Sequence, residues 1–274
     1  MRQSTLSLRG LNRELEAFLV EPERGSGRGP AIVVIHEIFG LDDHIRDVAT
    51  RIGREGYTVL APNLFSGPIA KLLTPANVAL AMAALRDAPP DLRAHPERFR
   101  AFAASQPAER RPVLEAFAQV TSPDQQDRFA EELKLCREHL GRLDLVDPSR
   151  IGAVGFCFGG AMVGRWATID PGLAAGVIFY GQAPPFERIP AIRARLLGLY
   201  GGEDPGITNG VPAFAQALRA AGKSFDYHVY PGARHAFFND ARPNYHPDSA
   251  RDAWRRVLEF LAAALKDAPP PSVA

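Results

Sequence analysis

The stretch RIGAVGFCFGG, residues 150–160, predicts a strand that turns sharply into a helix. Gly155 and Gly159 take the outer positions of a G-x-S-x-G pattern, with Cys157 in place of the serine. Small neighbours are needed at such a turn, because strand and helix approach closely there. A thiol at this point lies at a helix N-terminus, whose partial positive charge favours the thiolate. The stretch therefore indicates a nucleophilic cysteine, although a small buried thiol or a weak nucleotide-binding loop would fit the same letters.

Apolar strands and amphipathic helices alternate around this turn. AIVVIH (31–36) and YTVLAP (57–62) predict buried strands, separated by a helix that ends near Gly56. AAGVIFYG, ARLLGLYG and SFDYHVYP predict further strands, a helix is expected over residues 211–221, and DSARDAWRRVLEFLAAAL predicts a closing helix. Two short alternating stretches near the N-terminus suit an antiparallel strand pair. The order predicts an α/β fold with a mostly parallel central sheet and helices on both faces.

One domain over residues 1–266 accounts for this pattern in a chain of 274 residues. Residues 66–122 interrupt the alternation of strands and helices with a Pro- and Arg-rich stretch that is too long for an ordinary connection. We therefore expect a helical insertion or lid-like segment there. A long helix then begins near Pro123, with Cys136 on its apolar stripe as inert core. Residues 267–274 are expected to be a disordered tail.

The composition excludes several classes of protein. The formal net charge is +1, which gives no electrostatic case for nucleic acid or a membrane surface. Two cysteines make no disulfide framework, and we find neither a signal-peptide pattern nor an apolar run long enough to span a bilayer. We therefore expect a cytoplasmic protein acting on a small molecule, as a monomer or homodimer.

Two further residues follow predicted strands in the order that suits a catalytic triad. Asp204, in LYGGEDPG, and His235, in YPGARHAFF, each come directly after a strand, as Cys157 does. Carboxyl ends of parallel strands meet at one edge of the sheet, so a nucleophile, an acid and a base would meet there. A capping carboxylate and a loop histidine are the alternatives. Four other residues fit less well by strand face or chain order: Asp226, His228, Asp240 and His246.

The stretch HEIFGLDDH, residues 36–44, begins like the zinc motif H-E-x-x-H. Gly40 occupies the place of the second histidine, and His44 lies too far along to share a helical face with His36. We expect no metal site, and the chemistry of a cysteine triad needs no cofactor.

Taken together, the segment from VIHEIFG to APNLF and the motifs GAVGFCFGG, YGGEDPGI and YPGARHAFFND resemble the dienelactone hydrolase family, the cysteine-type α/β hydrolases also called carboxymethylenebutenolidases. The resemblance implies an α/β-hydrolase fold and a triad of Cys157, Asp204 and His235. It also implies that Glu37 contacts the resting thiol. The backbone N–H groups of Ile38 and Phe158 would then form the oxyanion hole.

The substrate-binding residues are less well defined by this resemblance. The family holds a substrate carboxylate with arginines, one of them shortly after the catalytic histidine, where this chain has Asn239. Arg234 and Arg242 flank that place. Near the strand ends we expect four substrate contacts: Phe39, Tyr180, Phe237 and Arg242.

The expected reaction is hydrolysis of a lactone or activated carboxylic ester through a thioacyl intermediate on Cys157. A thiolate is also a good leaving group, so its attack on an unactivated amide tends to revert. A general small-molecule carboxylesterase and a catalytically silent ligand-binding protein remain as alternatives.

Overall fold

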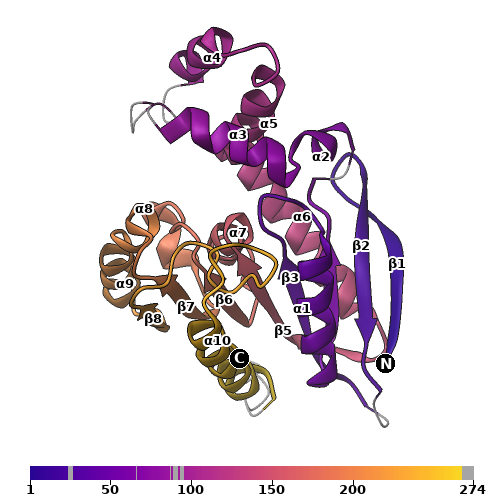
Figure 1. Ribbon diagram of the computed structural model, residues 1–274. Helices are drawn as coiled ribbons and strands as arrows, with labels where there is room; N and C mark the ends of the chain where they lie inside the picture. The colour runs from indigo at the N-terminus through magenta and orange to yellow at the C-terminus, as the bar shows by residue number, and fades with distance from the viewer. Residues whose placement is uncertain (24–26, 66, 87, 89–91, 93–95, 267–274) are drawn as a thin grey trace.

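The computed structural model describes residues 1–23, 27–65, 67–86, 88, 92 and 96–266, and within these ranges eight strands form one sheet (Figure 1). The sheet order is β1-β2-β4-β3-β5-β6-β7-β8. β1 and β2 form an antiparallel pair, β2 also runs antiparallel to β4, and the remaining pairs are parallel. The strands are β1 (Arg2–Arg9), β2 (Glu14–Glu21), β3 (Gly29–Ile35), β4 (Thr58–Pro62), β5 (Val146–Phe156), β6 (Ala175–Phe179), β7 (Arg195–Gly201) and β8 (Phe225–Tyr230).

Helices cover both faces of the sheet, which confirms the predicted α/β class (Figure 1). On one face α1 (Asp43–Arg54) and α10 (Pro247–Leu261) enclose an apolar core. On the other face α6 (Pro123–Gly141), α7 (Phe158–Ala167) and α9 (Val211–Ala220) enclose a second core, which includes Cys136. Within the described ranges, no helix combines the length and the apolar character that crossing a membrane requires.

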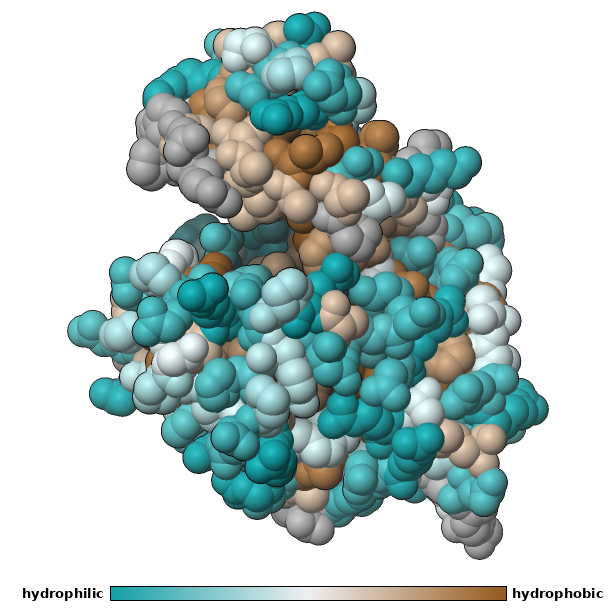
Figure 2. All heavy atoms as spheres, in the orientation of Figure 1, coloured by the Kyte–Doolittle hydropathy of each residue, from teal (hydrophilic) through white to brown (hydrophobic). Residues whose placement is uncertain are grey.

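The predicted range 66–122 contains four of the helices that the structure describes: α2 (Pro68–Leu72), α3 (Pro75–Arg86), α4 (Pro96–Ser105) and α5 (Arg111–Thr121). We call these four helices the cap. Three of them, α3, α4 and α5, share a small apolar cluster, which includes Ala81, Phe99 and Leu114. The cap projects beyond the carboxyl edge of the sheet (Figure 1), and the surface is hollowed between the cap and the rest of the molecule (Figure 2). The predicted tail, 267–274, lies outside the described residues.

Several boundaries differ from the sequence expectations for local reasons. β6 ends at Phe179, two residues earlier than expected, because Tyr180 has a φ of 40° and cannot continue a strand. α1 ends at Arg54, before Gly56 with its φ of 87°, as the sequence predicted. Two short elements have no periodic signal of their own: α8 (Pro205–Thr208) and the 3-10 helix η2 (Phe186–Ala191).

Glycines let α7 begin directly above the sheet edge. A Cβ atom on Gly155 would lie 2.1 Å from the carbonyl oxygen of Gly159, and one on Gly159 would lie 2.2 Å from that of Ile35. A Cβ atom on Gly181 would lie 2.3 Å from the carbonyl carbon of Gly160. Backbone thus packs on backbone here, because no side chain fits between the helix start and the strand ends.

We expect Gly155→Ala to destabilise the fold by roughly 3 kcal/mol, because the new methyl group meets backbone that cannot move aside. Urea unfolding followed by circular dichroism measures the change. Gly206→Ala is the matched control, since a Cβ atom there meets nothing within 4 Å. Its effect should stay within about 0.5 kcal/mol. Equal stability of the two variants would contradict the close approach.

Candidate active site

Cys157 lies in the turn between β5 and α7, where the sequence placed it. Its φ of 54° and ψ of −111° are unusual for a residue with a side chain, and its backbone N–H donates to the carbonyl of Phe179 at 3.0 Å. The residue is the N-cap of α7 and is only partly buried. The strained turn therefore keeps the thiol at a helix N-terminus and within reach of a substrate.

Asp204 and His235, predicted from chain order alone, are in direct contact. Asp204 follows β7, His235 lies in the loop between β8 and α10, and Oδ2 of Asp204 is 2.6 Å from Nδ1 of His235. Burial lowers the pKa of His235, but the charges and hydrogen bonds of Cys157 and Asp204 outweigh burial and raise it well above the ordinary value. The structure thus brings Cys157, Asp204 and His235 into one cluster.

Glu37 follows β3 at the same edge of the sheet, and its side chain is buried. Nδ2 of Asn239 donates to its Oε2 at 2.6 Å, and the hydroxyl of Tyr180 donates to its Oε1 at 3.4 Å. Burial raises the pKa of Glu37, while His44, Asn239 and His235 partly offset that rise. From the sequence, Asn239 had no expected role except as the replacement of an arginine. Its contact with Glu37 depends on the tertiary structure, because the two residues lie 202 positions apart.

The backbone N–H groups of Ile38 and Phe158 have no hydrogen-bond partner among the described residues. His36 fixes the loop that carries the first of them. Its Nδ1 lies 2.5 Å from the carbonyl oxygen of Glu37, and its Nε2 accepts from the N–H of Leu64 at 3.0 Å. These bonds require the neutral tautomer with the proton on Nδ1. Burial accordingly lowers the pKa of His36 to about 4.

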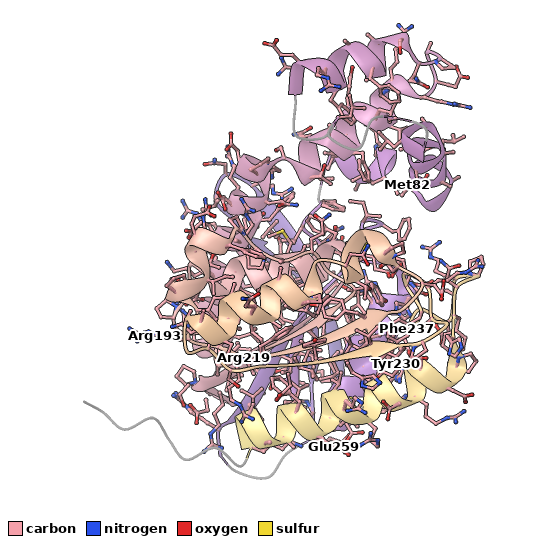
Figure 3. The ribbon with its side chains drawn as sticks, turned by 90° about the vertical axis from the view of Figure 1, so that its left-hand side faces the viewer. Met82, Arg193, Arg219, Tyr230, Phe237 and Glu259 are labelled. Carbon is pink, nitrogen blue, oxygen red and sulfur yellow. The ribbon has the colours of Figure 1, made fainter. Side chains whose placement is uncertain are left out.

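The four expected substrate contacts take different positions. Phe39 is partly buried, and the guanidinium of Arg242 lies 4.0 Å from its ring centroid. Phe237 is fully buried beside Tyr230, with ring centroids 5.0 Å apart (Figure 3). Tyr180 is fully buried as well, 5.1 Å from the ring of His235. Phe237 and Tyr180 are therefore buried side chains that pack against Tyr230 and His235, and contact with a substrate stays a prediction for all four residues.

The rival residues have other partners or exposed positions. Oδ1 of Asp240 lies 3.3 Å from Nδ1 of His44, and His246 caps α10 by accepting from the N–H of Ser249. Asp226 is exposed on β8, an edge strand of the sheet. Among the residues that the structure describes, no three histidine, cysteine, aspartate or glutamate side chains are grouped to hold a metal ion.

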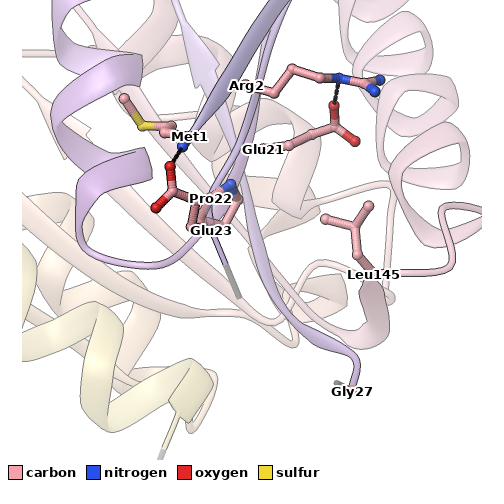
Figure 4. Close-up of a pocket in the computed structure, with 7 residues that line it drawn as sticks. All are labelled: Met1, Arg2, Glu21, Pro22, Glu23, Gly27 and Leu145. Atoms are coloured by element: carbon pink, nitrogen blue, oxygen red, sulfur yellow. Dashed lines mark hydrogen bonds and ion pairs between the residues drawn. The ribbon is translucent and has the colours of Figure 1, made fainter. Parts of the chain in front are cut away.

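A hollow of about 420 Å³ lies far from this cluster (Figure 4). It is lined by the start of β1, the end of β2 and the residues after it, Gly27, and Leu145 directly before β5, at the end of the parallel strands opposite Cys157. Two ion pairs line this hollow, one between Met1 and Glu23 and one between Arg2 and Glu21. The residues of the cluster take no part in this hollow.

These features define an α/β hydrolase: the order of the strands in the sheet, the cysteine in a strand-to-helix turn, and the acid and the histidine that follow later strands. The comparisons with known proteins narrow the class. The sequence profile of the Dienelactone hydrolase family matches residues 15–265, so the chain belongs to the dienelactone hydrolase family.

Known relatives align with this chain over most of its length. A protein from Saccharolobus solfataricus named "Putative carboxymethylenebutenolidase" is 34% identical over 92% of this chain and 95% of its own. A relative of the same name from Methylorubrum extorquens is 31% identical over 90% and 76%. A crystal structure titled "Putative Dienelactone Hydrolase" from Klebsiella pneumoniae superposes with a TM-score of 0.71 at 28% identity, covering 95% of this chain and 98% of that one.

We expect the stability of the protein to fall between pH 6.5 and pH 4 because of His36. The unfolded chain binds a proton at this residue near pH 6.5, whereas the folded protein does so only near pH 4, so stability present above pH 6.5 is lost as the pH falls. The loss should reach about 2 kcal/mol at pH 5. Urea unfolding of wild type and His36→Gln at pH 7.5 and 5.0 measures it, since glutamine does not titrate. A stability gap between the two proteins that does not narrow at pH 5.0 would refute the assignment.

Proposed function

We propose that the protein hydrolyses a lactone or activated carboxylic ester through a thioacyl intermediate on Cys157. The observation that carries the proposal is the 2.6 Å contact between Asp204 and His235 beside a thiol held in a strained turn. Family membership and the names of the relatives support the same substrate class.

The reaction follows from the positions of these groups. Because Nδ1 of His235 faces Asp204, its Nε2 is the nitrogen that takes the thiol proton. The sulfur attacks the carbonyl carbon, and the oxyanion accepts hydrogen bonds from the N–H groups of Ile38 and Phe158. The C–O bond breaks as His235 returns its proton to the leaving oxygen. His235 then takes a proton from water, the hydroxide attacks the thioester, and the thiol leaves with that proton.

In this proposal Glu37 opposes ionisation of the resting Cys157 thiol. A buried carboxylate close to a thiolate disfavours both charges, so the carboxyl group opposes early ionisation of Cys157 until a substrate displaces it. The hydrogen bonds from Asn239 and Tyr180 hold Glu37 at the cluster.

We propose that the cap is a lid over the reaction centre. α3 carries the exposed apolar side chains Leu80 and Met82, and Figure 3 places Met82 on the side of the cap that faces the rest of the molecule. A general carboxylesterase is the second candidate function, which is favoured by Asn239 standing where the family has an arginine for a substrate carboxylate.

We expect Cys157→Ala to lose p-nitrophenyl acetate and dienelactone turnover by at least about 10³-fold, because no other group replaces the nucleophile. Cys136→Ala is the matched control, since this second thiol is buried in the core and its pKa is raised to about 12 by burial. Initial rates with circular dichroism of each variant test the expectation. Turnover retained by folded Cys157→Ala would place the chemistry elsewhere.

We expect iodoacetamide to alkylate Cys157 at pH 7 at least about tenfold faster in wild type than in His235→Gln. His235 takes the thiol proton, and the imidazolium that forms stabilises the reacting thiolate, whereas glutamine cannot accept this proton. Mass spectrometry of the labelled peptide gives both rates, with Asp204→Asn as a variant of intermediate effect. Equal rates in wild type and His235→Gln would remove the physical basis of an activated nucleophile.

A further inference from the structure

Asn239 lies in the loop between β8 and α10 that also carries His235, and it is fully buried. Its backbone N–H donates to the carbonyl of Ala236 at 3.1 Å, and its own carbonyl accepts from the N–H of Arg242 at 3.1 Å. Ala236 has a φ of 64°, which a residue with a side chain rarely adopts. The loop that carries the proposed base is therefore built around Asn239.

Both ends of the Asn239 side-chain amide have a partner, so its orientation is determined. Its Oδ1 accepts from the N–H of Ala241 at 3.0 Å, and its Nδ2 donates to Oε2 of Glu37 at 2.6 Å. A rotation of the amide by a half turn would set its NH2 group against the N–H of Ala241, and two donors repel each other. The group that faces Glu37 is therefore a donor that carries no charge.

Both carboxyl oxygens of Glu37 face a donor. The hydroxyl of Tyr180, directly after β6, donates to Oε1 at 3.4 Å, and Asn239 donates to Oε2 at the shorter distance of 2.6 Å. A carboxylate accepts at both oxygens, whereas a protonated carboxyl group must donate from one of them. Burial raises the pKa of Glu37, and the bond from Asn239 opposes that rise because it favours the charged form.

Three further ionisable side chains act on Glu37 from the elements around it. Against the effect of burial, His44 and His235 lower the pKa of Glu37, and Asp42, the N-cap of α1, raises it. The His44 side chain is 2% exposed, and its Nδ1 lies 3.3 Å from Oδ1 of Asp240. Among these groups and Tyr180, Asn239 makes the shortest hydrogen bond to the carboxyl group, so its removal should have a direct effect on the proton of Glu37.

Glu37 and the Cys157 thiol act on the same two side chains. Burial, and after it the charges of Glu37 and Cys157, raise the pKa of Tyr180. Against the effect of burial, the charge and the hydrogen bond of Cys157 raise the pKa of His235, and His235 in turn acts on Glu37. A negative charge on Glu37 therefore disfavours a second negative charge on Cys157.

We propose that Asn239 is a positioning residue for Glu37, whose amide favours the charged carboxylate and sets the pH above which Glu37 opposes ionisation of Cys157. The proposal rests on the proposed function, which assigns this opposition to Glu37, and it adds the pH range. Below this pH Glu37 is a neutral acid and leaves the thiol unopposed. A guanidinium in place of the amide would cancel the charge of the carboxylate, whereas the amide orients it and leaves its charge to act on the thiol.

Infrared spectroscopy of the protonated Glu37 carboxyl group, followed over a pH titration, tests the proposal. Glu37→Gln identifies the band by removing it. We expect Asn239→Leu, which has a similar volume and no donor, to raise the pKa of Glu37 by about one unit or more, because a hydrogen bond to a charged group is lost. Asn239→Ala, which leaves room for its neighbours, should shift it in the same direction. No rise in either folded variant would overturn the proposal.

The sign of this change separates the proposed role from a structural one. Asn244→Leu is the matched control, because the exposed Asn244 ties the same loop by donating to the carbonyl of His235 at 3.0 Å. A loosened loop admits water to Glu37 and lowers its pKa towards the ordinary value, so the control should leave that pKa unchanged or lower it. A rise in the control equal to that in Asn239→Leu would refute the assignment.

Alkylation of the resting thiol tests whether the charge of Glu37 reaches Cys157. Midway between the two measured pKa values, Glu37 is mostly charged in wild type and mostly neutral in Asn239→Leu. At this pH we expect iodoacetamide to alkylate Cys157 about threefold or more faster in Asn239→Leu, since the opposing charge is absent. Adding Asn239→Leu to Glu37→Gln should leave the rate unchanged. An equal or lower rate in Asn239→Leu than in wild type would overturn the proposal.

Both measurements use the resting protein and therefore do not depend on turnover. If the pKa of Glu37 and the alkylation rate both rise in Asn239→Leu yet wild type hydrolyses no ester, the proposed function fails and the role of Asn239 stands. If the pKa of Glu37 does not rise, the role of Asn239 fails whatever the turnover.

Discussion

The close approach of α7 to the sheet edge is the constraint on which the site depends. Backbone atoms of Gly155 and Gly159 pack where a single methyl group would overlap the neighbouring backbone. This contact forces Cys157 into a left-handed conformation and aims the helix N-terminus at the thiol. The same packing brings Gly160 against Gly181, so the end of β6 is held beside the first turn of the nucleophile helix.

Two sets of ionisable side chains lie at the carboxyl edge of the sheet, and they differ in burial and in hydrogen bonding. Asp204 and His235 form a short hydrogen bond, which orients the imidazole ring for proton transfer with the thiol of Cys157. Glu37 is buried, burial raises its pKa, and Asn239 and Tyr180 are its hydrogen-bond donors. The edge of the sheet therefore carries a partly exposed Asp–His pair and, near it, a buried carboxyl group whose hydrogen bonds partly offset the effect of its burial.

Much of the fold followed from local patterns. Continuous apolar runs predicted the buried strands, and Gly56 ended α1 where a positive φ was needed. The end of β6 was missed, because the φ of Tyr180 is imposed by tertiary contacts and has no signature in its sequence. Chain order alone predicted that Asp204 and His235 would meet, since parallel strands bring their carboxyl ends to one edge.

The sequence by itself determined the class of fold, the family, and the set of side chains available for chemistry. Only the tertiary structure decided which of those side chains contact one another and which are buried. Asn239 reaches Glu37 across 202 positions of the chain, and Phe237 is buried in the core. Periodicity records which face of an element is apolar, whereas contacts between distant segments depend on packing that no local pattern encodes.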